Sequence, residues 1–280
     1  MNLKLFAIGL LAGTIAFISC NDQQTVSKAD TAKDSTAVVA LKEDSVSYTL
    51  DGKEYKGYVV YDENNKDKRP AILVVHEWWG LNDYSRSRAK QLAQMGYIAM
   101  ATDMFGNGQT AADPGQAQGL ATPFYKDPQL AKTRLDAAID KIKSYPQTDT
   151  ANIAAIGYCF GGYVVLNAAK LGANLKGVVS FHGGLGGVPV KKEMVKADIL
   201  VCHGEADDFV NKEVEPFKKS MDSAGVSYTF KSYADATHAF SNPGATEKGK
   251  KFNMPIQYNA AADADSWNDM KLFFNKIFFK

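Results

Sequence analysis

The fold is decided by Ile153-Ala154-Ala155-Ile156-Gly157-Tyr158-Cys159-Phe160-Gly161-Gly162, an apolar run that passes into a glycine-rich turn. The apolar half predicts a buried strand, and the residues after it predict a sharp turn and the start of a helix. The segment Gly157-Tyr158-Cys159-Phe160-Gly161 fits the pattern G-x-S-x-G of a nucleophile elbow, with Cys159 in place of the serine. The alternative is that Cys159 is a small buried apolar residue at a strand end.

A nucleophile elbow places strict demands on the residues around Cys159. The turn holds the nucleophile in a strained conformation at the tip of a strand, so the residues two before and two after it must be small. Gly157 and Gly161 occupy these two positions. Because the next helix begins at once, its N-terminal dipole is expected to lie under the sulfur and to favour the thiolate.

The remainder of the folded domain, expected over residues 44–280, alternates strands with helices. Strands are predicted at residues 46–50, 55–61, 71–75, 96–101, 153–157, 177–181, 199–202 and 227–233. Helices are predicted at residues 84–95, 129–144, 162–171, 211–224 and 259–279. Residues 107–127 show little periodicity and are expected to form an irregular excursion over the site. This order predicts an α/β domain with a mostly parallel central sheet of about eight strands and helices on both faces.

Composition narrows the class of protein. The 280 residues are 45% hydrophobic and 22% charged, which is ordinary for a soluble globular chain. The formal net charge of +1 gives no reason to expect nucleic acid as a partner. The histidines and cysteines lack the spacing of a metal site, and no phosphate-binding glycine loop is present, so we expect no metal or cofactor. Cys202, inside an apolar run, is expected to be a core residue.

Residues 1–20 have the pattern of a lipoprotein signal peptide. Lys4 supplies a positive charge, and residues 5–18 form an apolar segment that is short for a membrane span. The segment ends in Phe17-Ile18-Ser19-Cys20, which resembles a bacterial lipobox, in which the cysteine becomes the lipidated first residue of the mature protein. Phe17 stands where leucine is usual. A plain secretory signal and an uncleaved anchor are the alternatives.

Residues 21–43 are expected to form a flexible tether. They are rich in Asp, Lys, Thr, Ser, Ala and Gln and contain no aromatic residue, so they bury too little apolar surface to become ordered. We therefore expect a domain anchored by lipid in the cell envelope, on the periplasmic or outer-membrane side. Contact with the membrane is expected through the N-terminal lipid alone, and a monomer is favoured.

A cysteine elbow requires a histidine base and an acid that follow it along the chain. After Cys159 the first strong acid candidate is Asp207, in a loop that follows a predicted strand. Asp208 is its close competitor. The histidine candidate is His238, in the loop after the next strand. Three residue types in this order, each after a strand, indicate a catalytic triad.

The other three histidines have different expected roles. His76 ends a strand beside Glu77 and is expected to buttress the turn. His182 also ends a strand, where a structural role and a role in lining the site are equally compatible with the sequence. His203 precedes the acid loop and is expected to make a local hydrogen bond.

Four motifs together resemble those of the dienelactone hydrolase family, from about Lys53 to the C-terminus. They are His76-Glu77-Trp78-Trp79-Gly80-Leu81, Gly157-Tyr158-Cys159-Phe160-Gly161-Gly162, the acid loop at residues 204–210 and Thr237-His238-Ala239-Phe240. The resemblance implies an α/β-hydrolase fold and a triad of Cys159, His238 and Asp207. It also implies that Glu77 contacts the resting thiol and is displaced when substrate binds, which helps to form the thiolate. The alternative is that Glu77 is a surface carboxylate.

The implied reaction is hydrolysis of an ester or lactone by attack of the Cys159 sulfur on the carbonyl carbon. The oxyanion is expected to be held by the backbone N–H groups of Trp78 and Phe160. His238 is expected to move the proton and to activate water for deacylation.

The substrate-binding residues are expected among aromatic and polar side chains near the strand ends. An apolar wall is predicted from Trp78, Trp79, Phe105 and Phe124, although aromatic residues at strand ends are often core residues instead. In the lactone hydrolases of this family two arginines bind the substrate carboxylate, and alignment places Asn107 and Asn242 at these positions. Asparagine lacks the bidentate pairing of arginine, so we expect a neutral or differently charged small-molecule ester, lactone or thioester.

Two other classes of function use the same residues. One is a lipid-tethered binding protein that kept the fold without turnover, and the other is an acyltransferase or peptidase. The complete set of triad residues favours the hydrolase.

Overall fold

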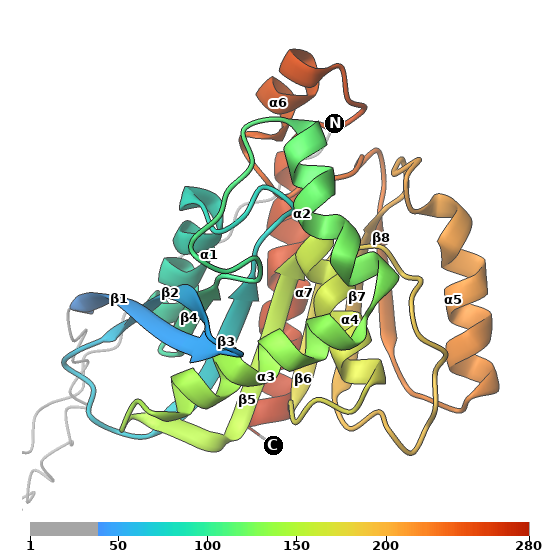
Figure 1. Cartoon of the computed structure of the whole chain (residues 1–280). Coiled ribbons are helices and arrows are strands. Elements are labelled where there is room, and N and C mark those ends of the chain that lie inside the picture. The colour runs from blue at the N-terminus through green and yellow to red at the C-terminus, as the bar shows by residue number, and fades with distance from the viewer. Residues whose placement is uncertain (1–38, 280) are drawn as a thin grey trace, which may run out of the picture. The chain divides into compact units, whose positions relative to one another are not determined.

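The computed structural model describes residues 39–279 (Figure 1). The predicted signal peptide, its Cys20 and the tether up to residue 38 lie outside the described residues. Strand β1 (Leu41–Leu50) begins before Asp44, because Leu41 already pairs with Asp62 of strand β2 (Lys53–Asp62). No helix within residues 39–279 has the length and apolar character needed to cross a membrane.

Eight strands form one sheet in the order β1-β2-β4-β3-β5-β6-β7-β8. The remaining strands are β3 (Arg69–Val75), β4 (Ile98–Thr102), β5 (Thr148–Tyr158), β6 (Gly177–Phe181), β7 (Asp198–Gly204) and β8 (Thr229–Tyr233). The hairpin of β1 and β2 is antiparallel, and β2 runs antiparallel to β4. Every other neighbouring pair is parallel. The prediction of a mostly parallel sheet of about eight strands is confirmed.

Helices cover both faces of this sheet (Figure 1). Helices α1 (Asp83–Gln94) and α7 (Ala260–Phe278) pack on one face. Helices α3 (Gln129–Lys143), α4 (Phe160–Lys170) and α5 (Asn211–Ser223) pack on the other, and α2 (Pro114–Lys126) contacts α3. Helix α6 (Ala245–Phe252) lies beyond the carboxyl ends of the parallel strands.

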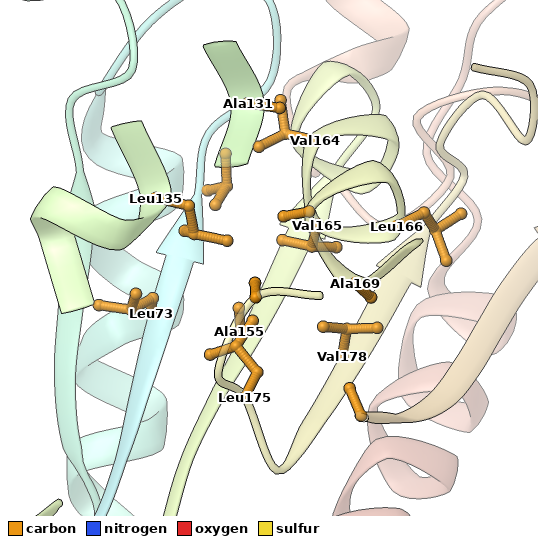
Figure 2. Close-up of a cluster of buried hydrophobic side chains, with 14 of the residues drawn as sticks. Leu73, Ala131, Leu135, Ala155, Val164, Val165, Leu166, Ala169, Leu175 and Val178 are labelled. Atoms are coloured by element: carbon orange, nitrogen blue, oxygen red, sulfur yellow. The ribbon is translucent and has the colours of Figure 1, made fainter. Parts of the chain in front are cut away.

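The central strands are buried on both faces, which explains their continuous apolar runs. Alternate residues enter different core layers: Leu73 of β3 joins the layer under α3 and α4, whereas its neighbour Ile72 joins the layer under α1 and α7. Figure 2 shows the first layer, in which Leu73 and Ala155 lie on the sheet below Leu135 and Val165. The two layers fix β5, and with it the position of the elbow.

The expectation of an irregular excursion at residues 107–127 is wrong for its second half, which is helix α2. Asp113 caps this helix by accepting a hydrogen bond from the Gln116 N–H at 2.9 Å, and Pro114 occupies its first turn. Internal glycines and Pro123 obscure the helical period in the sequence. Helix α6 was also not predicted, and both helices contribute to the candidate site.

The turn after β5 tolerates no side chain at its glycines. A Cβ atom on Gly157 would lie 2.0 Å from the Gly161 carbonyl oxygen. A Cβ atom on Gly161 would lie 2.3 Å from the carbonyl oxygen of Val75, which ends β3. Real Cβ atoms do not approach so closely, and the obstacle is backbone in both cases. The requirement for small residues at the elbow is therefore steric, and it joins α4 tightly to the sheet.

We predict that Gly161→Ala lowers the free energy of unfolding by about 3 kcal/mol or more, because the strand or the helix must move to admit the methyl group. The matched control is Gly119→Ala in α2, where no atom lies within 4 Å of the added Cβ. That change is expected to stabilise the helix by ~0.5–1 kcal/mol. Urea denaturation followed by circular dichroism measures both, and equal stabilities of the two variants would contradict the steric account.

Candidate active site

Cys159 lies at the turn between β5 and α4 with φ 53° and ψ −113°, a conformation that non-glycine residues rarely adopt. Its N–H donates to the Phe181 carbonyl oxygen at 3.0 Å and to Nδ1 of His182 at 3.1 Å. Its side chain is partly exposed and lines a cavity. The turn therefore presents the sulfur at the tip of the strand and at the N-terminal end of a helix.

His238 and Asp207 meet beside this cysteine. Nδ1 of His238 is 2.8 Å from Oδ2 of Asp207, and the Asp207 side chain is fully buried. The other carboxylate oxygen accepts from the N–H groups of Phe209 at 3.1 Å and Val210 at 3.3 Å. Asp208 is exposed. The structure thus places Asp207, rather than its competitor, against the histidine.

The electrostatics of His238 favour its protonated form. Burial disfavours the charged imidazole, but the negative charge of Cys159 and the hydrogen bond to Asp207 together hold the pKa of His238 well above its ordinary value. Asp207 therefore holds the imidazole of His238 through Nδ1 and favours its protonated form.

Glu77 is a buried carboxyl group, not a surface one, and it lines the same cavity. Its Oε2 accepts a hydrogen bond from Nδ2 of Asn242 at 2.7 Å. Burial raises the pKa of Glu77, although the charge of Lys248 and the bond from Asn242 oppose this effect. Asn242, predicted as a substrate contact, therefore has a defined structural role as the neutral partner of Glu77. Within residues 39–279, Glu77 makes no hydrogen bond to Cys159.

The two candidate oxyanion donors border the cavity. Phe160 is the first residue of α4, so its N–H has no acceptor within the helix. Trp78 lies in the turn that follows β3, and its side chain stacks edge-on against Trp79 at 5.2 Å between ring centroids. Both tryptophans and Phe160 line the cavity beside Cys159. The placement is compatible with the predicted oxyanion site.

His182 holds the elbow from behind. Its Nδ1 accepts from the Cys159 N–H, and its Nε2 lies 2.7 Å from the hydroxyl of Ser241, which lies 2.8 Å from the Tyr84 hydroxyl. Burial, followed by the charges of His238 and Arg88, lowers the pKa of His182 well below its ordinary value. The ring is therefore neutral, with Nδ1 as acceptor and Nε2 as donor. The sequence left its role open because a histidine at a strand end has no distinguishing motif.

The two other histidines make local contacts. Nδ1 of His76 lies 2.5 Å from the Glu77 carbonyl oxygen, and its Nε2 accepts from the Met104 N–H at 3.2 Å. It thereby buttresses the turn that carries Glu77. Nε2 of His203 lies 2.8 Å from Oδ1 of Asn211, which is the local hydrogen bond expected for this residue.

The cavity has a volume of about 710 Å³ and differs in part from the predicted binding wall. Trp78 and Trp79 line it, but Phe105 and Phe124 do not. These two rings are buried behind Phe160, at 5.2 and 4.9 Å between ring centroids, so they are core residues. An aromatic side chain is equally suited to the core and to the cavity wall, so only the packing shows which of the two it occupies.

Asn107 is also absent from the cavity lining, which corrects its prediction as a substrate contact. It is exposed, has φ 56°, and donates its N–H to the Glu54 carbonyl oxygen of β2 at 2.8 Å. This hydrogen bond connects the turn after β4 to the β1–β2 hairpin. The sequence also gave no signal for several lining residues that belong to no motif: Tyr125, Tyr163, Glu213, Lys248 and Met254.

This fold and this site define an α/β hydrolase: a nucleophile elbow after β5, an acid after β7 and a histidine after β8. The sequence profile of the dienelactone hydrolase family matches residues 55–278. The chain belongs to that family and is a dienelactone hydrolase-like enzyme for carboxylic esters or lactones, as its sequence motifs indicated. Within residues 39–279 no group of histidine, cysteine or acidic side chains is arranged to hold a metal ion.

Individual relatives support the assignment. The chain is 29% identical over 239 residues to Protein usf of Aquifex pyrophilus, covering 82% of this chain and 97% of the relative. It is 27% identical over 214 residues to a carboxymethylenebutenolidase of Rhodococcus opacus, covering 73% and 80%. The solved structure of a dienelactone hydrolase-like promiscuous phosphotriesterase from metagenomic libraries superposes with a TM-score of 0.79 at 32% identity, covering 85% of this chain and 99% of the other.

We predict that His182→Leu lowers kcat/KM by about 10- to 100-fold, because the elbow loses the acceptor that positions the Cys159 backbone. The pH profile of Cys159 alkylation by iodoacetamide is expected to change as well. The control is His203→Leu, which alters a histidine at the neighbouring strand end that contacts Asn211 instead. A folded His182→Leu protein with unchanged kcat/KM and an unchanged alkylation profile would disprove the positioning role.

Glu77 gives a prediction for the pH dependence of stability. Because its native pKa is raised above the ordinary value of 4.5, the native state holds this proton more tightly than the unfolded state. Its contribution to stability therefore falls as pH rises from the unfolded pKa to the native pKa. Glu77→Gln removes this loss, so the variant gains stability relative to wild type with rising pH, by at most ~1.4 kcal/mol per pH unit. Urea denaturation between about pH 5 and 8 measures the difference, and a pH-independent difference would contradict the assignment.

Proposed function

We propose that Cys159, His238 and Asp207 form a catalytic triad that hydrolyses an ester or lactone through an acyl-thioester intermediate. The observation that carries the proposal is the 2.8 Å contact between His238 Nδ1 and the buried Asp207 Oδ2, because His238 lines the same cavity as Cys159. Because Nδ1 is bonded to Asp207, Nε2 of His238 is available to exchange a proton with the Cys159 sulfur. This arrangement supports the roles of nucleophile for Cys159, base for His238 and orienting acid for Asp207.

Acylation begins from the thiolate–imidazolium pair. The Cys159 sulfur forms a bond to the carbonyl carbon, and the carbonyl π electrons move to the oxygen. The N–H groups of Phe160 and Trp78 stabilise the oxyanion, and each such donor lowers the barrier by about 3–4 kcal/mol. When the oxyanion collapses, the carbon–oxygen bond of the ester breaks and Nε2 of His238 gives its proton to the departing alkoxide. The acyl group remains on sulfur as a thioester.

Deacylation uses the neutral imidazole that remains. Nε2 of His238 takes a proton from water as the water oxygen attacks the thioester carbon. The second oxyanion collapses with release of the Cys159 thiolate and the carboxylic acid product. His238 is then protonated again, so the starting ion pair is restored.

Glu77 is proposed to influence the charge of this pair from its buried position. A neutral Glu77 places no negative charge beside the thiolate, whereas an ionised Glu77 would oppose it. The hydrogen bond from Asn242 holds the carboxyl group in the cavity wall. Since neither Asn107 nor Asn242 supplies a guanidinium group, we propose substrates other than carboxylate-bearing lactones.

The location of the enzyme is proposed from residues outside the described part. The lipobox-like Phe17-Ile18-Ser19-Cys20 supports lipidation of Cys20 and anchoring in the cell envelope, on the periplasmic or outer-membrane side. In this proposal a monomeric domain acts on small-molecule substrates and contacts the membrane through its lipid alone.

The experiment is a panel of small activated esters, lactones and thioesters, assayed with wild type and Cys159→Ala. We expect Cys159→Ala to lower kcat at least ~10³-fold, because the acyl intermediate is lost. Cys202→Ala is the control, since Cys202 is buried in β7 and burial raises the pKa of its thiol to about 12. Ligand binding by folded wild type without turnover of any class would favour a binding protein, and undiminished turnover by Cys159→Ala would exclude the proposed nucleophile.

A further inference from the structure

We propose that the cavity contains a subsite for a positively charged nitrogen, formed by Glu213, Tyr125 and Tyr163. The inference rests on the proposed function, because it takes this cavity as the substrate site. All three residues line the cavity together with Cys159 and His238. None of them belongs to a sequence motif of the triad or the elbow.

Glu213 is held in a fixed position at the edge of the cavity. It lies in the first turn of α5, and its Oε2 accepts hydrogen bonds from the N–H groups of Leu185 at 2.7 Å and Gly186 at 3.0 Å. Its second oxygen, Oε1, accepts no hydrogen bond within residues 39–279. The carboxylate is thus oriented by backbone and keeps one oxygen available to a ligand.

No cation of the described chain forms an ion pair with Glu213. Lys170 is a charged neighbour, but its Nζ donates to the carbonyl oxygens of Leu185 at 3.0 Å and Gly186 at 3.2 Å. Burial lowers the pKa of Lys170 to about 8, although the charge of Glu213 opposes the shift. Lys170 therefore supports the loop at Leu185 and Gly186 and forms no ion pair with Glu213.

Aromatic rings complete the subsite. The rings of Tyr125 and Tyr163 pack edge-on with centroids 4.8 Å apart. Gly184 leaves space between the tyrosine and the carboxylate: a Cβ atom there would lie 3.6 Å from Cδ2 of Tyr163 and 3.7 Å from Oε2 of Glu213. A carboxylate beside aromatic rings is the chemistry that recognises an ammonium group, since both attract a cation.

Glu213 differs from Glu77, the other carboxyl group in the cavity wall. Glu77 is buried and bonded to Asn242, and burial raises its pKa. Glu213 is partly exposed to the cavity and bonded to backbone only. The favoured substrate is accordingly an ester, lactone or thioester with an ammonium group in its acyl or alcohol part.

The test compares two p-nitrophenyl esters of equal shape and different charge. One is the ester of γ-trimethylammoniobutyrate, and the other is its carbon isostere, in which a tert-butyl group replaces the trimethylammonium group. For wild type we expect kcat/KM for the cationic ester to exceed that for the isostere by ~10-fold, mainly through KM. In Glu213→Gln this preference is expected to disappear while kcat/KM for the neutral isostere changes less than about 2-fold. The side-chain oxygen of glutamine still accepts from Leu185 and Gly186, so the loop keeps its support.

The matched control is Glu215→Gln, which removes an exposed charge from the same helix, outside the cavity. It is expected to keep the wild-type preference, which excludes a general effect of net charge. The subsite would be overturned if wild type hydrolysed both esters at equal rates, or if Glu213→Gln lowered kcat/KM equally for both esters. It would also be overturned if Glu215→Gln lost the preference for the cationic ester as Glu213→Gln does. If wild type hydrolyses neither ester, this result counts against the proposed hydrolase function and leaves the cation subsite to be tested by binding. Calorimetric binding of butyltrimethylammonium to wild type, with ~10-fold loss in Glu213→Gln, then decides the subsite alone.

Discussion

The close approach of the β5–α4 turn to the end of β3 is the constraint on which the site depends. Gly161 lies against the carbonyl oxygens of Val75 and His76 so tightly that a single methyl group would overlap backbone. This contact presses the start of α4 onto the sheet and holds Cys159 at φ 53°. The strain in that residue is sustained by two core layers, by the β-sheet register and by the hydrogen bond to His182. Backbone packing beside Cys159, supported by the two core layers, thus positions the sulfur.

Burial then sets the charges around this sulfur. Burial by itself disfavours every charged group, but the charge of Cys159 and the hydrogen bond to Asp207 raise the pKa of His238 above its ordinary value. Glu77 has only a neutral amide as its hydrogen-bond partner, and burial raises its pKa. His182, directly behind the elbow, remains neutral and acts as an acceptor. The same cavity is therefore lined by an imidazole with a raised pKa, a buried carboxyl group with a raised pKa and the partly exposed carboxylate of Glu213. Differences in burial and partners separate the roles of chemically similar side chains.

Local chemistry made the elbow, the triad candidates and the parallel sheet predictable from sequence. Gly157 must be small because a Cβ atom there would overlap Gly161, only four residues away in the sequence. A continuous apolar run likewise indicates a buried strand from local sequence alone. The cavity wall was less predictable, because it depends on long-range packing. Phe105 and Trp79 are both aromatic residues near strand ends, yet one is core and the other lines the cavity. Helix α2 was not predictable because its glycines and Pro123 hide its helical period, and the position of Tyr125 in the cavity wall depends on this helix.

In the proposed mechanism, Cys159 carries the acyl group during turnover. The most direct measurement is rapid acid quenching of wild type during hydrolysis of a p-nitrophenyl ester, followed by peptide mass analysis. We expect an acyl mass increment on the peptide containing Cys159, formed at least as fast as the steady-state turnover. Turnover with the acyl group on another residue, or with no increment on any peptide under conditions where deacylation limits the rate, would contradict it.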